Sequence, residues 1–242
     1  MKKLARRIVR FVPAEIREPI LFELRALAGR KFSKTIPVPA GAPAYLNLGC
    51  GTFCFDDYIN VDMFLMPGQP KPHALFHGVD LRYPLPLPSA SIDGVFSEHA
   101  FEHMTFPQAG RLFAECFRVM KPGARMRVSV PDVSLFIEAY GKSDDAWFRE
   151  WERLYLTESE DAERRTRRLI TPMTAISFVT QEYGHLSAWD FATMSSFLAA
   201  AGFAQIEKCH YRTGGDPRLL RDLDADDRRF VSLYVEAVRP NV

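Results

Sequence analysis

The chain has 242 residues, of which 47% are apolar and 12% aromatic, so it can fill the core of one domain of ordinary size. The net charge at pH 7 is only +1, which gives no support to bulk binding of a polyanion. We predict no membrane-spanning helix, because no run of about 18 apolar residues occurs, and no cleavable signal peptide. The four cysteines form no CxxC pair, which argues against a zinc ribbon or a disulfide scaffold and predicts free thiols in a reducing cytosol.

The charge is unevenly distributed along the chain. Residues 1–34 hold ten Lys and Arg against three Glu, a net charge of +7, so the rest of the chain carries a net charge of −6 (+1 minus +7). Leu4, Ile8 and Phe11 recur at helical spacing with arginines on the opposite side. This pattern predicts a basic amphipathic arm over residues 1–43, ending in the linker KTIPVPAGAPA.

Three roles remain open for this arm. It could lie on an anionic membrane surface, dock on a partner, or pack its apolar side on its own domain. We therefore expect a cytoplasmic protein, with peripheral contact to the inner face of the membrane as one open role. Nucleic acid is not expected as a partner, because the rest of the chain is acidic and lacks a basic-aromatic stripe.

From residue 44 onward, short apolar runs alternate with helical stretches, which is typical of a parallel sheet with helices on its faces. Thr105 can cap a helix, Pro107 suits its first turn, and Gly202 stops a later helix. We therefore predict one α/β domain over residues 44–242. Its predicted elements are strands at 45–48, 58–61, 74–76 and 91–97, a helix at 106–120, a strand at 125–130, a helix at 189–201, and strands at 203–209 and 230–238.

Residues 142–183 interrupt this alternation with a long, charged stretch. We predict a helical lid inserted into the domain. Trp147, Trp151 and Tyr155 recur at helical spacing and are expected to form its packing face, while EDAERRTRR (160–168) is expected to be a solvated helix surface.

Two glycines one residue apart follow the first predicted strand, in YLNLGCG. Gly49 and Gly51 have no side chains, so the backbone there can approach a ligand closely and adopt conformations closed to other residues. Asp62 closes the next predicted strand, and ligands of open α/β sheets lie beyond the carboxyl ends of the strands. A carboxylate at this position is well placed to accept hydrogen bonds from two ribose hydroxyls.

A dinucleotide site fits these residues poorly. Its fingerprint requires a third glycine, where this chain has Cys54, and an acid about 20 residues on, whereas Asp62 lies much closer to Gly49. Asp56 and Asp57 would also repel a diphosphate. A cofactor that has a ribose but no phosphate fits better.

Five stretches follow one another in order: LNLGCG, YINVD, VDLRYPLPLPSASIDGVFSEHAFEH, FRVMKPGARMRVSVPD and SAWDFATMSSFLAAAGF. Together they resemble the class I S-adenosylmethionine-dependent methyltransferases, in particular the compact branch associated with glycan and lipopolysaccharide synthesis. The resemblance covers residues 44–238 except most of the insertion. It implies a Rossmann-like fold with a seven-stranded, mainly parallel sheet and helices on both faces.

The resemblance also implies a role for each matching residue. Asp62 matches the ribose-binding acid, and Ser97 to His99 match the end of the fourth strand, where cofactor and acceptor meet. Two departures concern the methionine part of the cofactor: Asn47 replaces the acid that usually opens the first motif, and the helix after the glycines is cut to a turn. The residues implied to bind S-adenosylmethionine are Asn47, Gly49, Cys50, Gly51, Asp62, Asp80, Leu81 and Ser97, with Asp80 and the backbone of Leu81 reading the adenine amino edge.

Methyl transfer from a sulfonium needs alignment and removal of a proton from the acceptor, and the stretch SEHAFEHM offers candidate bases. His99 is the first candidate, because a neutral imidazole near pH 7 is suited to deprotonating a hydroxyl. His185 follows the insertion, where related enzymes bring a loop over the acceptor, and is the second. Glu102 and His103 are expected only to brace the neighbouring helix.

The same stretch also offers candidate ligands for a metal ion. The pattern H-x-x-E-H at 99, 102 and 103, with His185 later, resembles the metal-binding set of small-RNA 3′-end methyltransferases and of ubiquinone-pathway O-methyltransferases. Such ligands could hold a divalent ion that orients a diol. We favour the metal-free reading and predict no metal.

The sequence therefore predicts an S-adenosylmethionine-dependent methyltransferase that acts on a small-molecule or glycan-type acceptor, at oxygen. One alternative is a non-catalytic domain of the same fold that serves as a binding or scaffold subunit in glycan synthesis. Another is a nicotinamide-dependent oxidoreductase. The acceptor and the oligomeric state are not specified by the sequence.

Overall fold

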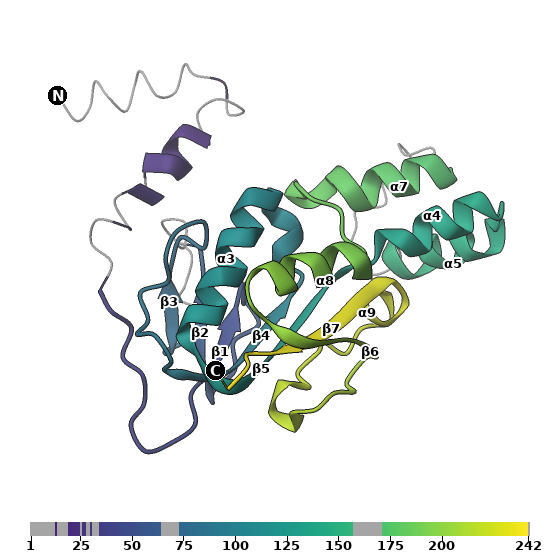
Figure 1. The fold of residues 1–242 in the computed structure, drawn as a ribbon. Helices are drawn as coiled ribbons and strands as arrows, with labels where there is room; N and C mark the ends of the chain where they lie inside the picture. The colour runs from purple at the N-terminus through teal and green to yellow at the C-terminus, as the bar shows by residue number, and fades with distance from the viewer. Residues whose placement is uncertain are drawn as a thin grey trace.

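Within the residues that the computed structural model describes, the chain forms one seven-stranded sheet (Figure 1). The described residues are 13, 19–24, 26–27, 30, 34–63, 73–156 and 171–241. The strand order is β3-β2-β1-β4-β5-β7-β6; the pairs from β3 to β5 are parallel, and β7 is antiparallel to both of its neighbours. The predicted Rossmann-like, mainly parallel sheet is confirmed. The strands are β1 (Tyr45–Leu48), β2 (Tyr58–Asp62), β3 (Phe76–Gly78), β4 (Ile92–Glu98), β5 (Met120–Pro131), β6 (Ala204–Cys209) and β7 (Ser232–Val238).

The carboxyl ends of β1, β2 and β4 meet at one edge of this sheet. Leu48 at the end of β1 pairs with Val61 of β2, and Asn47 pairs with Phe96 of β4. Since the three strands run in the same direction, the loops that leave them start side by side. Those loops begin at Gly49, Met63 and His99.

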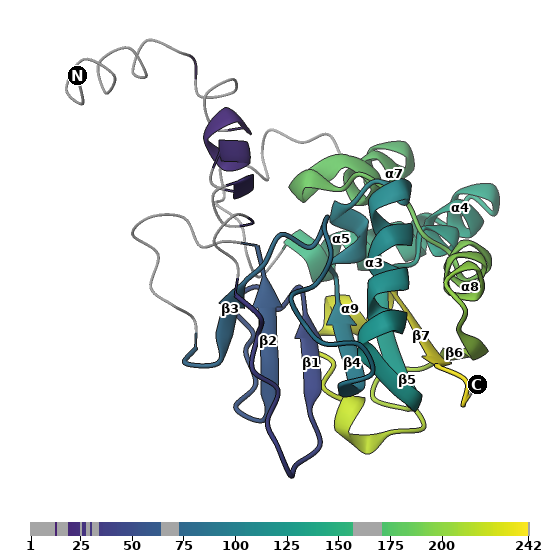
Figure 2. The same ribbon diagram turned by 60° about the vertical axis from the view of Figure 1, so that its left-hand side comes forward.

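Helices α3 (Phe106–Val119) and α8 (Phe191–Ala200) cover one face of the sheet (Figure 2). The start of α3 is as predicted: Pro107 lies in the first turn, and the backbone N–H of Thr105 donates to the side chain of Gln108 at 2.9 Å. Burying one Leu or Phe side chain contributes about 1.5–3 kcal/mol, so the apolar stripe of α3 anchors the helix firmly. The buried residues of this stripe are Ala109, Leu112, Phe113, Cys116 and Val119.

The opposite face of β1, β2 and β4 is covered by the connection between β6 and β7. Leu219, in the short helix η3 (Pro217–Leu219), packs with Tyr45, Tyr58 and Phe96. The connection is also held by a fully buried ion pair between Arg127 on β5 and Asp222, with Nη2 and Oδ2 2.7 Å apart. This connection, predicted only as a polar segment, therefore comes to lie beside the β1 loop.

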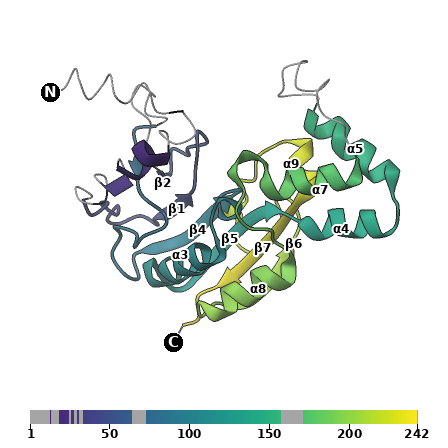
Figure 3. The same cartoon turned by 90° about the horizontal axis from the view of Figure 1, so that it is seen from above.

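Four helices form a second hydrophobic cluster beyond one end of the sheet (Figure 3). Trp151 is buried in it, Trp147 stacks on Phe230, and Tyr155 packs edge-on against Phe178, so the predicted packing face is confirmed. The expected strand 230–238 begins later than predicted, because Phe230 belongs to the last turn of a helix. The stretch 160–168 lies outside the described residues. The helices of the cluster are α4 (Val133–Gly141), α5 (Asp145–Leu156), α7 (Pro172–Gln181) and α9 (Asp226–Val231).

A short piece of the predicted arm is helical, at residues 19–24 and 26–27, and lies over the carboxyl ends of β2 and β3 (Figure 2). Ala26 is buried, and the N–H of Ile36 in the linker donates to the carbonyl of Pro86 at 2.7 Å. This part of the arm therefore packs on its own domain. In the described part of the chain, no helix has the length and apolar character to cross a membrane. Contact of the basic arm with a membrane or a partner remains a prediction that falls mostly outside the described residues.

Candidate active site

The loop after β1 adopts a backbone that favours glycine. Gly49 and Gly51 have φ values of +72° and +52°. A Cβ atom at Gly49 would overlap the Cβ of Ala100, so this loop passes directly against the segment that follows β4. A Cβ at Gly51 would meet no atom within 4 Å. The floor of the site is therefore bare backbone beside open space, which a ligand can approach closely.

The carboxylate of Asp62 faces this loop from the end of β2. One oxygen accepts a hydrogen bond from the N–H of Gly51 at 2.5 Å and the other accepts from the N–H of Met63 at 2.5 Å. Burial raises the pKa of Asp62, although both backbone hydrogen bonds favour its charged form. Each carboxylate oxygen has further acceptor capacity, which fits the two adjacent hydroxyls of a ribose.

Three cavities meet at this edge of the sheet. The arm-side cavity has a volume of about 510 Å³, and its lining includes Phe22, Gly51, Asp62, Leu81, Arg82 and His103. The loop-side cavity has a volume of about 390 Å³, and its lining includes Asn47, Gly49, Cys50, Glu98, Arg221 and Arg228. The histidine cavity has a volume of about 340 Å³, and its lining includes Glu102, His103, Tyr155, Tyr183, His185 and Arg228. His99 lines all three.

Asn47, Cys50 and Ser97, all predicted to bind the cofactor, lie in different settings. The side-chain amide of Asn47 donates to Asn60 Oδ1 at 2.9 Å and to a loop carbonyl at 2.8 Å, so it braces β1 against β2 at the wall of the loop-side cavity. Cys50 lines the same cavity, and burial raises the pKa of its thiol. Ser97 is fully buried, donates its hydroxyl to the carbonyl of Leu48 at 2.9 Å, and is not among the described residues that line the three cavities.

Asp80 and Leu81, the predicted adenine-binding pair, also lie in different settings. Leu81 lines the arm-side cavity. The buried carboxylate of Asp80 accepts hydrogen bonds from Arg82 (Nε and Nη2, each at 2.9 Å) and from Arg30 at 2.5 Å. Burial alone would raise the pKa of Asp80, but the two arginines outweigh burial and hold the pKa below its usual value. Asp80 therefore fixes Arg82 at the cavity wall.

His99 follows β4 in a left-handed conformation, with φ of +49°, which is uncommon for a residue other than glycine. Its Nδ1 lies 3.1 Å from the Glu102 carboxylate, and its Nε2 lies 2.7 Å from Ser232 Oγ. Burial lowers the pKa of His99, against the opposing effect of Glu102. The site therefore holds a neutral imidazole at the junction of the cavities.

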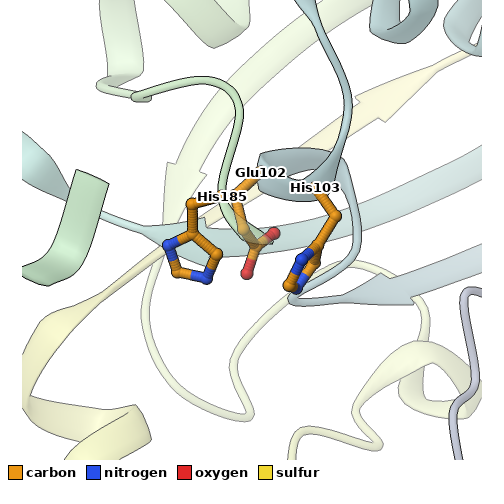
Figure 4. Close-up of side chains that lie close together, drawn as sticks. All are labelled: Glu102, His103 and His185. Atoms are coloured by element: carbon orange, nitrogen blue, oxygen red, sulfur yellow. The ribbon is translucent and has the colours of Figure 1, made fainter. Parts of the chain in front are cut away.

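His185 comes to lie beside His103, with ring centroids 4.9 Å apart (Figure 4). The backbone carbonyl of Glu102 accepts hydrogen bonds from Leu186 and Ser187, so the loop carrying His185 is tied to the short helix η1 (Phe101–His103). The structure thus brings both predicted catalytic residues, His99 and His185, to the histidine cavity.

Three charged residues line the loop-side cavity: Glu98, which lies in the stretch that the sequence marks as offering candidate bases, and two arginines that sequence reasoning did not identify. Glu98 accepts from the N–H of Leu223 at 3.1 Å, and burial raises its pKa to about 7. Arg221 and Arg228 reach the cavity from the connection after β6 and from α9. These arginines lie in a polar segment that carries no local motif, so only the folded topology places them at the site.

Comparisons with known proteins give a family match over part of the chain. Residues 67–128 match the family model described as a methyltransferase domain. No curated protein matches the sequence.

The solved structures to which the chain is similar have low sequence identity to it. A SAM-dependent methyltransferase from Archaeoglobus fulgidus is 16% identical, with 90% of this chain and 94% of that chain covered and a TM-score of 0.47. A SAM-dependent methyltransferase from Methanosarcina mazei is 14% identical, with coverages of 84% and 95% and a TM-score of 0.46. Human N-acetylserotonin methyltransferase in complex with SAM is 14% identical, with coverages of 82% and 48% and a TM-score of 0.43.

The matched segment contains β3, β4, α3 and most of β5, and it excludes β1 and β2, which lead to the glycine loop and Asp62. The family match thus covers 62 of the 242 residues, about a quarter of the chain.

Proposed function

We propose that the protein is an S-adenosylmethionine-dependent methyltransferase that methylates a hydroxyl oxygen of a small-molecule or glycan-type acceptor. The cofactor S-adenosylmethionine would occupy the arm-side and loop-side cavities, and the acceptor the histidine cavity. The observation that carries this proposal is the position of His99, which lines all three cavities. When bound, the cofactor supplies an activated methyl group on a sulfonium.

The arm-side cavity suits the adenosine part. Asp62 accepts hydrogen bonds from the ribose hydroxyls, and Gly51 lets the backbone approach the ligand. Leu81 and Phe22 offer apolar surface to the adenine ring. Asp80 acts indirectly, since its carboxylate holds Arg82 in the wall.

The loop-side cavity suits the methionine part. Arg221 and Arg228 offer positive charge to its carboxylate. Asn47 stands where related enzymes have an acid, but Glu98 on the neighbouring strand lines the same cavity and can accept from the ammonium group. We infer that Glu98 compensates for the missing acid of the first motif.

The histidine cavity suits the acceptor. Its volume of about 340 Å³ is close to the lower end for small-molecule sites, and Tyr155 and Tyr183 offer ring surfaces and hydroxyls. His99, held neutral by burial, can take the proton of an acceptor hydroxyl. An imidazole placed to deprotonate a hydroxyl supports methylation at oxygen.

The test is calorimetry with S-adenosylmethionine, followed by turnover with a panel of hydroxylated small molecules and sugars, detected by mass spectrometry as a methyl ether. His99→Asn should keep cofactor binding within a few fold and lose roughly 10²–10⁴-fold in turnover. His210→Ala, an exposed histidine outside the three cavities, is the matched control. Turnover that survives in His99→Asn would remove His99 from the chemistry, and methylation at nitrogen only would overturn the choice of oxygen.

A further inference from the structure

We propose that Glu102, His103 and His185 bind a divalent metal ion of the Zn²⁺ class at the wall of the histidine cavity. This inference rests on the proposed function, because the ion would face the acceptor. It replaces the metal-free expectation from the sequence, on three independent observations.

The first observation is geometric. Each of the three residues offers one ligand atom, and these atoms lie within 4.8 Å of one another, with the Glu102 carboxylate between the two rings (Figure 4). The positions are fixed by backbone: the carbonyl of Glu102 accepts from the N–H of Leu186 at 2.7 Å and from that of Ser187 at 3.2 Å. Two segments distant in sequence are thus held together at this point.

The second observation is the carboxylate itself. Glu102 is only 2% exposed, and the Nδ1 of His99 lies 3.1 Å from one of its carboxylate oxygens. The other oxygen has no hydrogen-bond partner among the described residues. A buried carboxylate with one unpaired oxygen is unfavourable, and a bound cation would compensate its charge.

The third observation is the tautomer of His185. Its Nδ1 lies 2.8 Å from the backbone carbonyl of Val179. A carbonyl only accepts, so Nδ1 carries the hydrogen and Nε2 keeps a free lone pair. A ligand histidine that donates its other N–H to a carbonyl is the arrangement that orients imidazoles on metals.

The donor set indicates the kind of ion. Two imidazoles and one carboxylate, with further positions open toward a cavity, match catalytic zinc sites and suit borderline cations more than Mg²⁺ or Ca²⁺. The histidine cavity supplies the open side.

The test uses full-length protein without a histidine tag, stripped with a chelator. Zn²⁺ binding is measured by calorimetry, and Co²⁺ is added as a probe whose visible absorption reports nitrogen and oxygen ligation. We expect one equivalent of Zn²⁺ to bind, and we expect His185→Ala and Glu102→Gln to weaken Zn²⁺ binding at least about tenfold. His73→Ala and His210→Ala, outside the cluster, should bind like the parent.

Binding of S-adenosylhomocysteine distinguishes a failure of the metal site from a failure of the proposed function. S-adenosylhomocysteine should bind the stripped protein and both ligand variants, which also shows that the variants are folded. Absence of stoichiometric Zn²⁺ binding, or equal binding by His185→Ala, overturns the metal site and leaves the proposed function standing. Failure of the stripped protein to bind S-adenosylhomocysteine argues instead against the assignment of the cofactor cavities.

Discussion

The backbone N–H of Gly51 donates a 2.5 Å hydrogen bond to the side chain of Asp62. The glycine belongs to the β1 loop and the acid to the end of β2, and the parallel register of Leu48 with Val61 brings the two together. The carboxylate thus closes one wall of the arm-side cavity while the glycine provides its floor. In the proposed function, cofactor binding depends on this contact, so the first predictions concern it.

Asp62→Ala should weaken S-adenosylhomocysteine binding about ten- to a hundredfold. Hydrogen bonds to a charged group contribute about 1.5–3 kcal/mol each, and about 1.4 kcal/mol corresponds to a factor of ten. Calorimetry measures the change. Asp56→Ala removes an exposed acid that pairs with His73 and should bind like the parent; an unchanged affinity in Asp62→Ala would remove this residue from the cofactor site.

Gly49→Ala should destabilise the fold more than Gly51→Ala. Both substitutions force a left-handed backbone on alanine, at about 1–2 kcal/mol, but only the methyl at position 49 overlaps Ala100, which adds about 1–3 kcal/mol. Urea unfolding compares the two. The double variant Gly49→Ala/Ala100→Gly should recover the overlap part, and equal stability of the two single variants would contradict the close approach.

Much of the fold could be predicted from sequence because its signals are local. The apolar run before Gly49 and the capping pattern at Thr105 each define an element within a few residues. The beginning of β7 could not be placed this way, since Phe230 continues an apolar run into the strand. In the fold its ring stacks on Trp147, and the last turn of α9 extends over it. A contact between distant residues decided that boundary.

The candidate site likewise contains residues that local sequence patterns predict and residues that only the fold brings there. The positions of Asp62 and His99 follow from the ends of strands, which sequence patterns mark. Arg221 enters the loop-side cavity only because the connection after β6 folds back across β1. Arg30 pairs with Asp80 from the arm, 50 residues earlier. No local pattern encodes such pairings, so the arginines of the site required the structure.

Cofactor affinity should fall as the pH drops below about 7, because of Glu98. Burial raises the pKa of this carboxyl to about 7, with Arg228 and Arg127 opposing the rise and Asp222 adding to it. Below that pH Glu98 is protonated and neutral, and it no longer attracts the ammonium group of S-adenosylhomocysteine. Calorimetry at pH values from about 6 to about 8 measures the change in affinity for S-adenosylhomocysteine.

Glu98→Gln supplies the control for this pH dependence. The variant keeps the shape of the side chain but cannot ionise, so its affinity should be low and nearly constant over the same range. A parent protein whose affinity does not change with pH, or a variant with the same slope as the parent, would exclude Glu98 as the ammonium partner.

Arg30→Ala should lower the free energy of unfolding by about 1–3 kcal/mol, because it removes a charged donor from a carboxylate that is 1% exposed. Glu23→Gln breaks the partly exposed pair with Arg82 and should cost at most about 1 kcal/mol.

The pH dependence of stability tests the same contact. The pKa of Asp80 is lowered in the folded state, so the contribution of Asp80 to stability is present above its unfolded pKa and is lost as the pH falls through its folded pKa. Urea unfolding at neutral and at acidic pH therefore separates the effects: the difference between parent and Arg30→Ala should shrink in acid. A loss in Glu23→Gln as large as that in Arg30→Ala would show that the arm is held by its exposed pair rather than by Asp80.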